Sequence, residues 1–459
     1  MSLPSSIDYT KILPIAAGNP RAMRRTFLPV NGQSFNAAGN NIVRIEISAD
    51  QFWDPLHSYL RFDVTNGANT CGADFGGGHG FIRRLRLEQA GNVIMDTNRY
   101  DRLLSAILLP CQSGADSQAH RSITEMQTYG NSVAAAAINT PAAAAVADGG
   151  YLTAIANDST QIAALATTQY CIPLVGGLFS QEKLVPLQLL SSSPLTIEIE
   201  LSPAADAMVS AGGGNTDYTM SNIRYIASLV DVSPDVDAQV RMVQEMSGGH
   251  IVLNSTDYTH FNGNIPANAV GMQAINVPAR RKSMKSLLWV GASQTALNFL
   301  NYRNSFGGGL NLNSYHAKIG SVNHPATPVE ANFNVNGPGG TALNGRGEAF
   351  MELSKCFGTT GSVIGLGQLN RMNYAVRTGT AAEGRTAAST PFHFAPMGLD
   401  LEAFQRTAIE SGVNTADRSL PISLILSHTG AQAAQTLDAY VLADALFYIN
   451  SDGSMSVSV

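Results

Sequence analysis

The chain has 459 residues, which exceeds the usual size of a single hydrophobic core and predicts two or more domains. Only 14% of its residues are charged, against roughly 25% in average soluble proteins, and its net charge is −6. Proteins dedicated to nucleic acid present a basic face and a high pI, so this composition argues against direct, sequence-specific nucleic-acid binding.

Cysteine usage and hydropathy bear on two further classes. The four cysteines form no Cys-x-x-Cys pair, so we expect reduced, partly buried thiols in a protein made inside a cell, not a zinc site or a disulfide scaffold. They are Cys71, Cys111, Cys171 and Cys356. Because no eighteen consecutive residues are apolar, we also expect neither a signal peptide nor a membrane span.

Residues 1–34 are expected to form an extended N-terminal arm. Its basic residues are Lys11, Arg21, Arg24 and Arg25. With Asp8 as the single acid, the arm has a net charge of +3 in an otherwise acidic protein. This charge indicates either a solvated terminus or an arm that docks on a neighbouring subunit or an acidic inner surface.

The first domain is predicted over 35–232. Apolar and polar residues alternate over 42–48 and 59–64, which is the pattern of half-buried strands. The glycines of 76–80 lead into a strand and lack a following Lys-Ser or Lys-Thr, which argues against a phosphate-binding loop. Over about 112–168 the pattern is lost, so we expect a long surface insertion that serves packing between subunits or display.

A helix is predicted just before this insertion. Apolar side chains recur at helical spacing from Tyr100 to Leu108. Thr97 or Asn98 is expected to cap the start of the helix, and Pro110 is expected to end it. We expect the helix to cover strand ends at the edge of a sandwich.

One supersecondary unit occurs twice, near the end of each half of the chain. Each copy opens with a proline and an alternating strand, at 195–201 and again at 422–427. A Gly- or Ala-rich connection follows, and then a longer strand that begins at Tyr218 in the first copy and at Tyr440 in the second. The separation of about 222 residues suits a duplicated β-domain and not a solenoid repeat.

A linker helix is predicted over 233–249, between the two domains. Ser233 is a good N-cap and Pro234 suits the first turn. Gly248 and Gly249 suit the end of the helix.

The second domain is expected over 250–459. It repeats the order of the first domain with few identities, and it includes an insertion over about 300–347. A short helix near 348–357 corresponds in order to the helix that ends at Pro110.

Residue patterns typical of enzymes do not occur in the sequence. The nine histidines form no His-x-His or His-x-x-x-His pair. Glu198 and Glu200 point the same way from one strand, but a glycosidase pair also needs an opposing cleft, so we interpret them as an exposed polar face. Neither a Gly-x-Ser-x-Gly elbow nor a nucleophilic cysteine signature is present. We therefore expect no enzyme, with no catalytic, cofactor-binding or metal-binding residues.

A series of segments resembles a known family. They are FWDPLHSYLRFDV (52–64), IRRLRLEQAGNVIMD (82–96), RYDRLLSAILL (99–109), LVPLQLL (184–190), LTIEIEL (195–201) and NIRYIASLVDVSPDV (222–236). Together they resemble the double jelly-roll major capsid proteins of eukaryotic dsDNA viruses. The resemblance is greatest to the capsid proteins of polinton-like viruses and virophages, and it spans nearly the whole chain in order.

This resemblance implies an all-β fold of two tandem eight-stranded jelly-roll sandwiches, with long loop insertions and a few short helices. It implies a structural protein of the virion shell, assembled inside the host cell, whose homotrimers form pseudo-hexameric capsomers of an icosahedral capsid. Neighbouring capsomers, penton and other minor capsid proteins are the implied partners, with an internal membrane as a further candidate. Lys11, Arg21, Arg24 and Arg25 would then lie on the inner face.

Two other functions stay open at the level of sequence. A jelly-roll carbohydrate-binding, spike or minor capsid protein would need an exposed aromatic platform, whereas Trp53 and Trp289 both lie in or beside strand patterns typical of a core. A sandwich hydrolase would need Glu198 and Glu200 to line a cleft.

Overall fold

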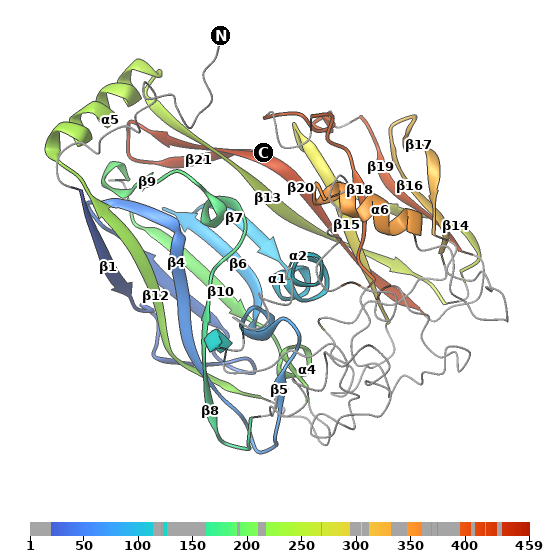
Figure 1. Cartoon of the computed structure of the whole chain (residues 1–459), viewed down its shortest axis with the longest axis horizontal. Coiled ribbons are helices and arrows are strands. Elements are labelled where there is room, and N and C mark those ends of the chain that lie inside the picture. Colours follow the sequence, from blue (N-terminus) through green and yellow to red (C-terminus); the bar gives the residue numbers. More distant parts are fainter. Residues whose placement is uncertain are drawn as a thin grey trace, which may run out of the picture.

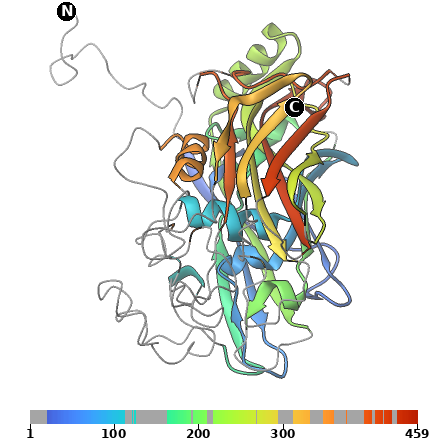
Figure 2. The same cartoon turned by 90° about the vertical axis from the view of Figure 1, so that its right-hand side faces the viewer.

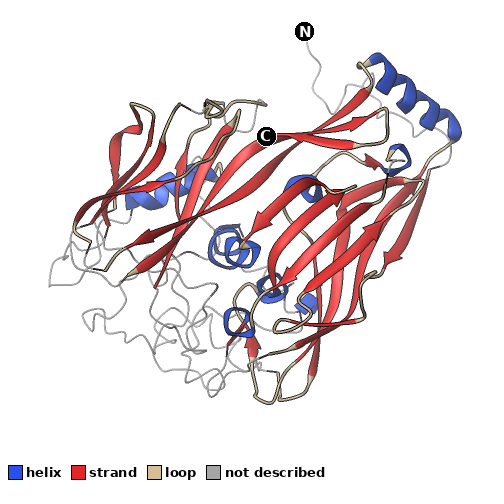
Figure 3. Cartoon of the chain, turned by 180° about the vertical axis from the view of Figure 1, so that it is seen from behind, coloured by secondary structure: helices blue, strands red, loops and turns tan. Residues whose placement is uncertain are grey.

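The structure is a computed structural model. It describes residues 20–112, 121, 123–125, 162–190, 193–209, 217–267, 269–293, 304, 312–331, 347–359, 369, 374, 395–404, 409–417, 419–428 and 434–459. Two β-sandwiches lie side by side, one built by each half of the chain (Figure 1). Strands dominate both of them, and the described helices are short and few (Figure 3).

The first sandwich consists of a six-stranded and a four-stranded sheet. The larger sheet has the order β1-β12-β4-β8, with β2 beside β12 and β9 beside β4. Its strands are β1 (Arg21–Phe27), β2 (Ser34–Asn36), β4 (Phe52–Thr65), β8 (Thr167–Ile172), β9 (Val185–Pro186) and β12 (Thr219–Asp231). The smaller sheet has the order β3-β10-β6-β7, formed by β3 (Ile42–Ile47), β6 (Ile82–Gln89), β7 (Asn92–Asn98) and β10 (Leu195–Leu201). The short strands β5 (Gly72–Ala73) and β11 (Met208–Val209) pair separately.

The second sandwich repeats this plan. One sheet has the order β13-β20-β15-β18 with β21 beside β20, and the other has the order β14-β19-β16-β17. The strands are β13 (His250–Ile265), β14 (Gly271–Asn276), β15 (Met284–Ser293), β16 (Leu312–Ile319), β17 (Val322–Glu330), β18 (Met397–Asp400), β19 (Ile422–His428), β20 (Gln435–Asn450) and β21 (Met455–Ser458).

Strand order identifies both sandwiches as jelly rolls. In chain order, β1, β3, β4, β6, β7, β8, β10 and β12 of the first half occupy the same sheet positions as β13 to β20 of the second. In each half the first, eighth, third and sixth strands form one sheet, and the second, seventh, fourth and fifth form the other. The predicted fold of two tandem eight-stranded jelly rolls is therefore confirmed.

The duplicated sequence unit occupies equivalent places in the two sandwiches. Strands β10 and β19 both alternate strictly between buried and half-buried residues, as their sequences predict. The following strands, β12 and β20, both lie second from the edge of the facing sheet. Apolar side chains on the inner faces of these strands contribute to the core of each sandwich.

Helix α5 (Pro234–Met246) connects the two sandwiches and lies at one end of the molecule, near the start of β1 and near β21 (Figure 1). Ser233 occupies the N-cap position and Pro234 is the first helical residue. After the helix, Gly248 and Gly249 have φ angles of 79° and 88°, in the left-handed region that favours glycine. The prediction of a helix at this place is confirmed.

The helix expected before the first insertion differs from the prediction. Strand β7 continues to Asn98, and Arg99, with φ of 51°, makes the turn into α1 (Tyr100–Arg102) without a side-chain cap. A π-helical segment, η2 (Leu103–Leu108), leads into α2 (Leu109–Gln112), so that Pro110 does not end the helix. The wider π turn changes the hydrogen-bond register directly before the proline, which lacks an N–H.

Two predicted boundaries also differ. Within the expected arm, β1 pairs with β12 along its whole length, so the first sandwich begins by residue 21. The expected insertion over 300–347 contains the whole β16–β17 hairpin, because the edge strand β17 is polar and rich in proline and shows no alternation. Most of the insertion expected over 112–168 lies outside the described residues.

The remaining described helices are short. They are η1 (Gly77–Phe81), η5 (Gly177–Ser180), η6 (Leu187–Leu189), α4 (Ala204–Ala207) and α6 (Gly347–Cys356). Helix α6 follows β17 as α1 follows β7, in agreement with the predicted order. No helix in the described part of the chain is long and apolar enough to cross a membrane.

Candidate functional site at the junction of the two sandwiches

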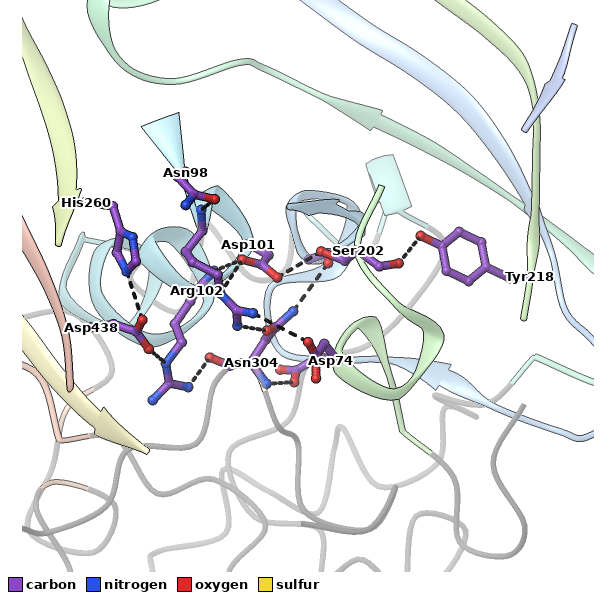
Figure 4. Close-up of polar contacts among 12 residues, drawn as sticks. Asp74, Asn98, Asp101, Arg102, Ser202, Tyr218, His260, Asn304 and Asp438 are labelled. Atoms are coloured by element: carbon purple, nitrogen blue, oxygen red, sulfur yellow. Dashed lines mark hydrogen bonds and ion pairs between the residues drawn. The ribbon is translucent and has the colours of Figure 1, made fainter. Parts of the chain in front are cut away.

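A buried polar network joins the two sandwiches through the helix that follows β7 (Figure 4). Its central residue is Arg102, only 1% exposed, which reaches from the first sandwich into the second. Arg102 Nε donates to Asp438 Oδ2 on β20 at 2.8 Å. Its Nη1 donates to the carbonyl oxygen of Asn304 and its Nη2 to that of Gly291, both at 3.0 Å. The planar guanidinium is suited to these divergent acceptors because its donors have fixed directions.

Asp438 is held ionised in this buried place. Its other carboxylate oxygen accepts a hydrogen bond from His260 Nε2 on β13 at 2.9 Å. Burial alone would raise the pKa of Asp438, but the His260 hydrogen bond and the charges of Arg102 and Arg99 outweigh burial and lower it to about 2. The carboxylate is therefore charged at any physiological pH.

A second branch of the network lies within the first sandwich. Ser202 Oγ donates to Asp101 Oδ2 at 2.8 Å, and Tyr218 donates to the carbonyl oxygen of Ser202 at 2.7 Å. Arg99 Nε lies 3.4 Å from Asp101 Oδ1, yet burial raises the pKa of Asp101 overall. Asn304, which lies between β15 and β16 in the sequence, belongs to this branch as well, because its side chain accepts from Arg99 Nη2 at 3.1 Å.

Further hydrogen bonds across the junction go to backbone groups. Gln89, at the end of β6, donates to the carbonyl oxygen of Gly453 at 3.0 Å and accepts from the N–H of Met455 at 2.5 Å. Ser255 on β13 donates to the carbonyl oxygen of Gly177 at 2.7 Å. The two sandwiches are therefore joined at several places, and the network has the character of a structural lock: its charges are buried, paired and hydrogen-bonded.

The structure describes three of the four predicted basic contact residues, and these three lie away from this junction. Arg21, Arg24 and Arg25 are exposed on the edge strand β1, and Lys11 lies outside the described residues. Arg24 Nη2 donates to the Tyr59 hydroxyl at 3.4 Å. Their assignment to an inner face stays a prediction.

Of the two carboxylates considered for a hydrolase, Glu198 belongs to a ladder of ion pairs across neighbouring strands. Glu198 lies 2.8 Å from Arg44 on β3 and 3.6 Å from Arg86 on β6. Opposite charges on neighbouring strands of one sheet stabilise strand pairing, which accounts for Glu198 without catalysis. Among the described residues, no three His, Cys, Asp or Glu side chains are grouped as metal ligands.

Other candidate sites are filled by core packing. The glycine-rich segment forms the buried helix η1, and a Cβ on Gly78 would lie 2.6 Å from Ile172 Cγ2, which leaves no room for a phosphate. Trp53 and Trp289 are both completely buried, so neither tryptophan offers a platform for a sugar ring. The four cysteines are free, and two of them, Cys71 and Cys111, are buried.

Sequence reasoning did not single out the residues of the junction. A signal exists in β20, whose sequence QTLDAYVLADALFYIN places aspartates in an otherwise apolar run. A second signal is Arg102 within an apolar helix. Charges in such places are rarely buried unless they are paired, so each predicts a partner.

The comparison with solved structures agrees with the double jelly-roll fold. Neither protein-family models nor curated protein sequences give a match. The crystal structure of VP54 of PBCV-1, fitted into a reconstruction of the virophage Sputnik, matches with a TM-score of 0.57 and 9% identity over 98% of this chain and 99% of that one. The major capsid protein of Faustovirus matches with a TM-score of 0.55 and 8% identity over 95% and 92% of the two chains. The major capsid protein of mavirus matches with a TM-score of 0.52 and 9% identity over 100% of this chain and 95% of that one.

Proposed function

We propose that this chain is the structural major capsid protein of an icosahedral dsDNA virus and resides in the virion shell. The observation that carries the proposal is the whole-length match in fold to solved capsid proteins, two of which are named as major capsid proteins. Two complete jelly rolls, locked together by buried charges, give each chain the rigid two-part body that a shell subunit needs.

The proposed assembly is a homotrimer. Three copies of a chain with two similar sandwiches would form a ring with six similar corners, a pseudo-hexameric capsomer. Such capsomers tile a shell with neighbouring capsomers, while penton and other minor capsid proteins occupy the remaining positions. Many modest contacts between subunits then stabilise the shell through multivalency.

The domain division is part of the proposal. We assign the first jelly roll to residues up to 232, the linker to 233–249 and the second jelly roll to 250–459. The end of the molecule that carries α5 would face the interior, together with Lys11 and the arginines of β1. Three apolar side chains exposed on α5, Met242, Val243 and Met246, support a contact there with a minor capsid protein or an internal membrane.

The mass of the purified protein in solution tests this function. We expect light scattering at neutral pH and moderate salt to give a stable species of about three times 48.4 kDa, or larger shells. A clean monomer at all concentrations would contradict the proposal and would redirect attention to glycan binding by a jelly-roll protein.

A further inference from the structure

A lysine lies between two carboxylates on neighbouring segments of the second sandwich. Lys285 on β15 has its Nζ 2.9 Å from Oδ1 of Asp444 on β20, and 3.1 Å from Oε1 of Glu402, which follows β18. Strand β15 pairs with β20 on one side and with β18 on the other, which brings the three side chains together. In Figure 2 the β14-β19-β16-β17 sheet faces the viewer, and these strands belong to the sheet behind it.

The second carboxylate oxygen of Asp444 accepts two hydrogen bonds. Ser283 Oγ donates to Asp444 Oδ2 at 2.7 Å, and the backbone N–H of Glu410 donates to the same oxygen at 2.9 Å. The Ser283 hydroxyl itself accepts from the N–H of Gly412 at 3.0 Å, which leaves its own proton for Asp444. Two fixed donors of this kind stabilise negative charge that develops on the oxygen they contact.

The segment that supplies these donors lies unusually close to the start of β15. Val413 forms a β-bridge with Met284, and a Cβ on Gly412 would lie only 2.4 Å from the carbonyl oxygen of Met284. Glu410 has a φ angle of 56°, in the left-handed region that few residues other than glycine adopt. Backbone in such conformations is found at functional sites, where the surrounding contacts hold it in place.

We propose that Lys285 and Asp444 condense with each other, so that an isopeptide bond joins β15 to β20. Nζ passes one proton to Oδ1 and attacks Cγ, while Oδ2 carries the developing negative charge. Glu402 Oε1 takes a second proton from Nζ and delivers it to Oδ1 as the Cγ–Oδ1 bond breaks. Oδ1 leaves as water with both protons, and Glu402 is restored. The reaction needs no oxidant and no co-reactant, and it does not depend on how the chain assembles.

The hydrogen bonds around Asp444 suit the product as well as they suit the ion pair. Oδ2 would become the carbonyl oxygen of the new amide and would keep Ser283 and the N–H of Glu410 as its donors. Nζ would keep one hydrogen, which Glu402 Oε1 would accept. Because none of these groups would lose its partner, the site is already arranged around an amide.

Burial favours the linked state. The side chains of Lys285, Glu402 and Asp444 are only 13%, 10% and 8% exposed. Burying two charges is expensive, whereas the amide that replaces them is neutral. Groups held in contact also react with effective molarities of about 10⁵–10⁸ M, which offsets the preference of free amines and acids in water for the unlinked state.

Protonation of the lysine determines how fast the bond forms. Burial alone would lower the pKa of Lys285, but the hydrogen bonds and charges of Asp444 and Glu402 outweigh burial and raise it. The resting amine is therefore charged, and its proton must move before Nζ can attack. We expect a slow reaction that continues after folding, with linked and unlinked chains present together in fresh protein.

The intact mass of the full chain tests the inference. We expect folded wild-type protein, incubated at neutral pH, to lose about 18 Da, the mass of one water, until the unlinked form has disappeared. Trypsin should then fail to cleave after Lys285, and the digest should contain one branched peptide that joins Lys285 to Asp444. A simple ion pair would change neither the mass nor the digest.

Two variants separate the bond from the ion pair. Lys285→Arg keeps the positive charge between the two carboxylates but removes the nucleophilic amine, so we expect a folded protein that keeps its full mass. Glu402→Gln keeps a hydrogen-bonding side chain but removes the proton carrier, and we expect it to slow the mass loss by about 100-fold or more. Circular dichroism verifies that both variants are folded.

The matched control is Lys355→Arg, which changes another lysine that pairs with a glutamate, Glu352 on α6. This variant should lose water at the wild-type rate. Wild-type protein that keeps its full mass after prolonged incubation, with normal cleavage after Lys285, would overturn the inference. A mass loss that persists in Lys285→Arg would place the reaction elsewhere and would overturn it as well, and equal rates in Glu402→Gln and the wild type would overturn the role of Glu402.

Discussion

Replacing Arg102 with methionine is expected to weaken the junction between the two sandwiches severely. The change keeps an unbranched side chain of comparable length but removes the charge and the hydrogen bonds to Asp438, Asn304 and Gly291. Asp438 would remain buried, with a hydrogen bond from His260 Nε2 at 2.9 Å.

The expected loss of stability follows from the Asp438 carboxylate, which would stay buried without its partner Arg102. Removing one partner of a buried ion pair typically costs about 3–5 kcal/mol, because the remaining charge is left without compensation. Asp438→Asn should cost less, since the new amide oxygen can still accept from Arg102 Nε and the guanidinium keeps its hydrogen bonds to two backbone carbonyl oxygens. We expect the double variant Arg102→Met/Asp438→Asn to lose about 2 kcal/mol less stability than the sum of the losses in the two single variants.

The tryptophans provide the assay. Trp53 and Trp289 are the two tryptophans of the chain, and each is fully buried in a different sandwich. In versions that retain only one of them, urea-induced changes in fluorescence report the unfolding of each sandwich separately. We expect coincident transitions in the wild type and separated transitions in Arg102→Met, because the lock between the sandwiches is lost.

Two results would refute this reasoning. One is a decrease of less than about 1 kcal/mol in the free energy of unfolding of Arg102→Met, which would mean that the network contributes little to stability. The other is strict additivity in the double variant, which would mean that Arg102 and Asp438 act independently.

Three further changes probe other parts of the structure. Burial raises the pKa of Asp257 from 3.8 to about 7, so the folded state holds this proton more tightly than the unfolded state does. The free energy of unfolding therefore falls as the pH rises from about 4 to about 7. Asp257→Asn should remove this fall, and urea titrations above pH 7 should show a stabilisation of up to about 4 kcal/mol. Gly78→Ala should cost about 1–3 kcal/mol by overpacking against Ile172, whereas Gly80→Ala in the same short helix, with its nearest neighbouring atom 3.9 Å away, should cost clearly less in the Trp53 assay. Glu198→Gln should lower the free energy of unfolding by about 1 kcal/mol or less, and this effect should become smaller with added salt. A loss of several kcal/mol would show that the ladder is more than a surface feature.

Much of the fold could be predicted because, in many strands, the alternation of apolar and polar residues already indicates which side chains are buried. The alternation in β10 and β19 follows from one face on the core and one partly solvated, and the repeat of this unit indicated the duplication. Helix α5 carries its own start and stop residues, so its bounds were predicted closely.

The elements that escaped prediction depend on contacts distant in sequence. Arg102 and Asp438 are 336 residues apart, and no local pattern joins them. Strand β1 has six exposed residues in a row and is a strand because β12 supplies its hydrogen bonds. Strand β17 is an exposed edge with two prolines, so its sequence resembles a loop although it pairs with β16.

The central claim, that this chain forms capsomers, is tested most directly by electron cryomicroscopy of the purified protein. We predict threefold particles in which six jelly rolls form a ring, with first and second sandwiches in alternation. Particles that hold a single pair of jelly rolls, or assemblies in which no ring of six is present, would contradict the account.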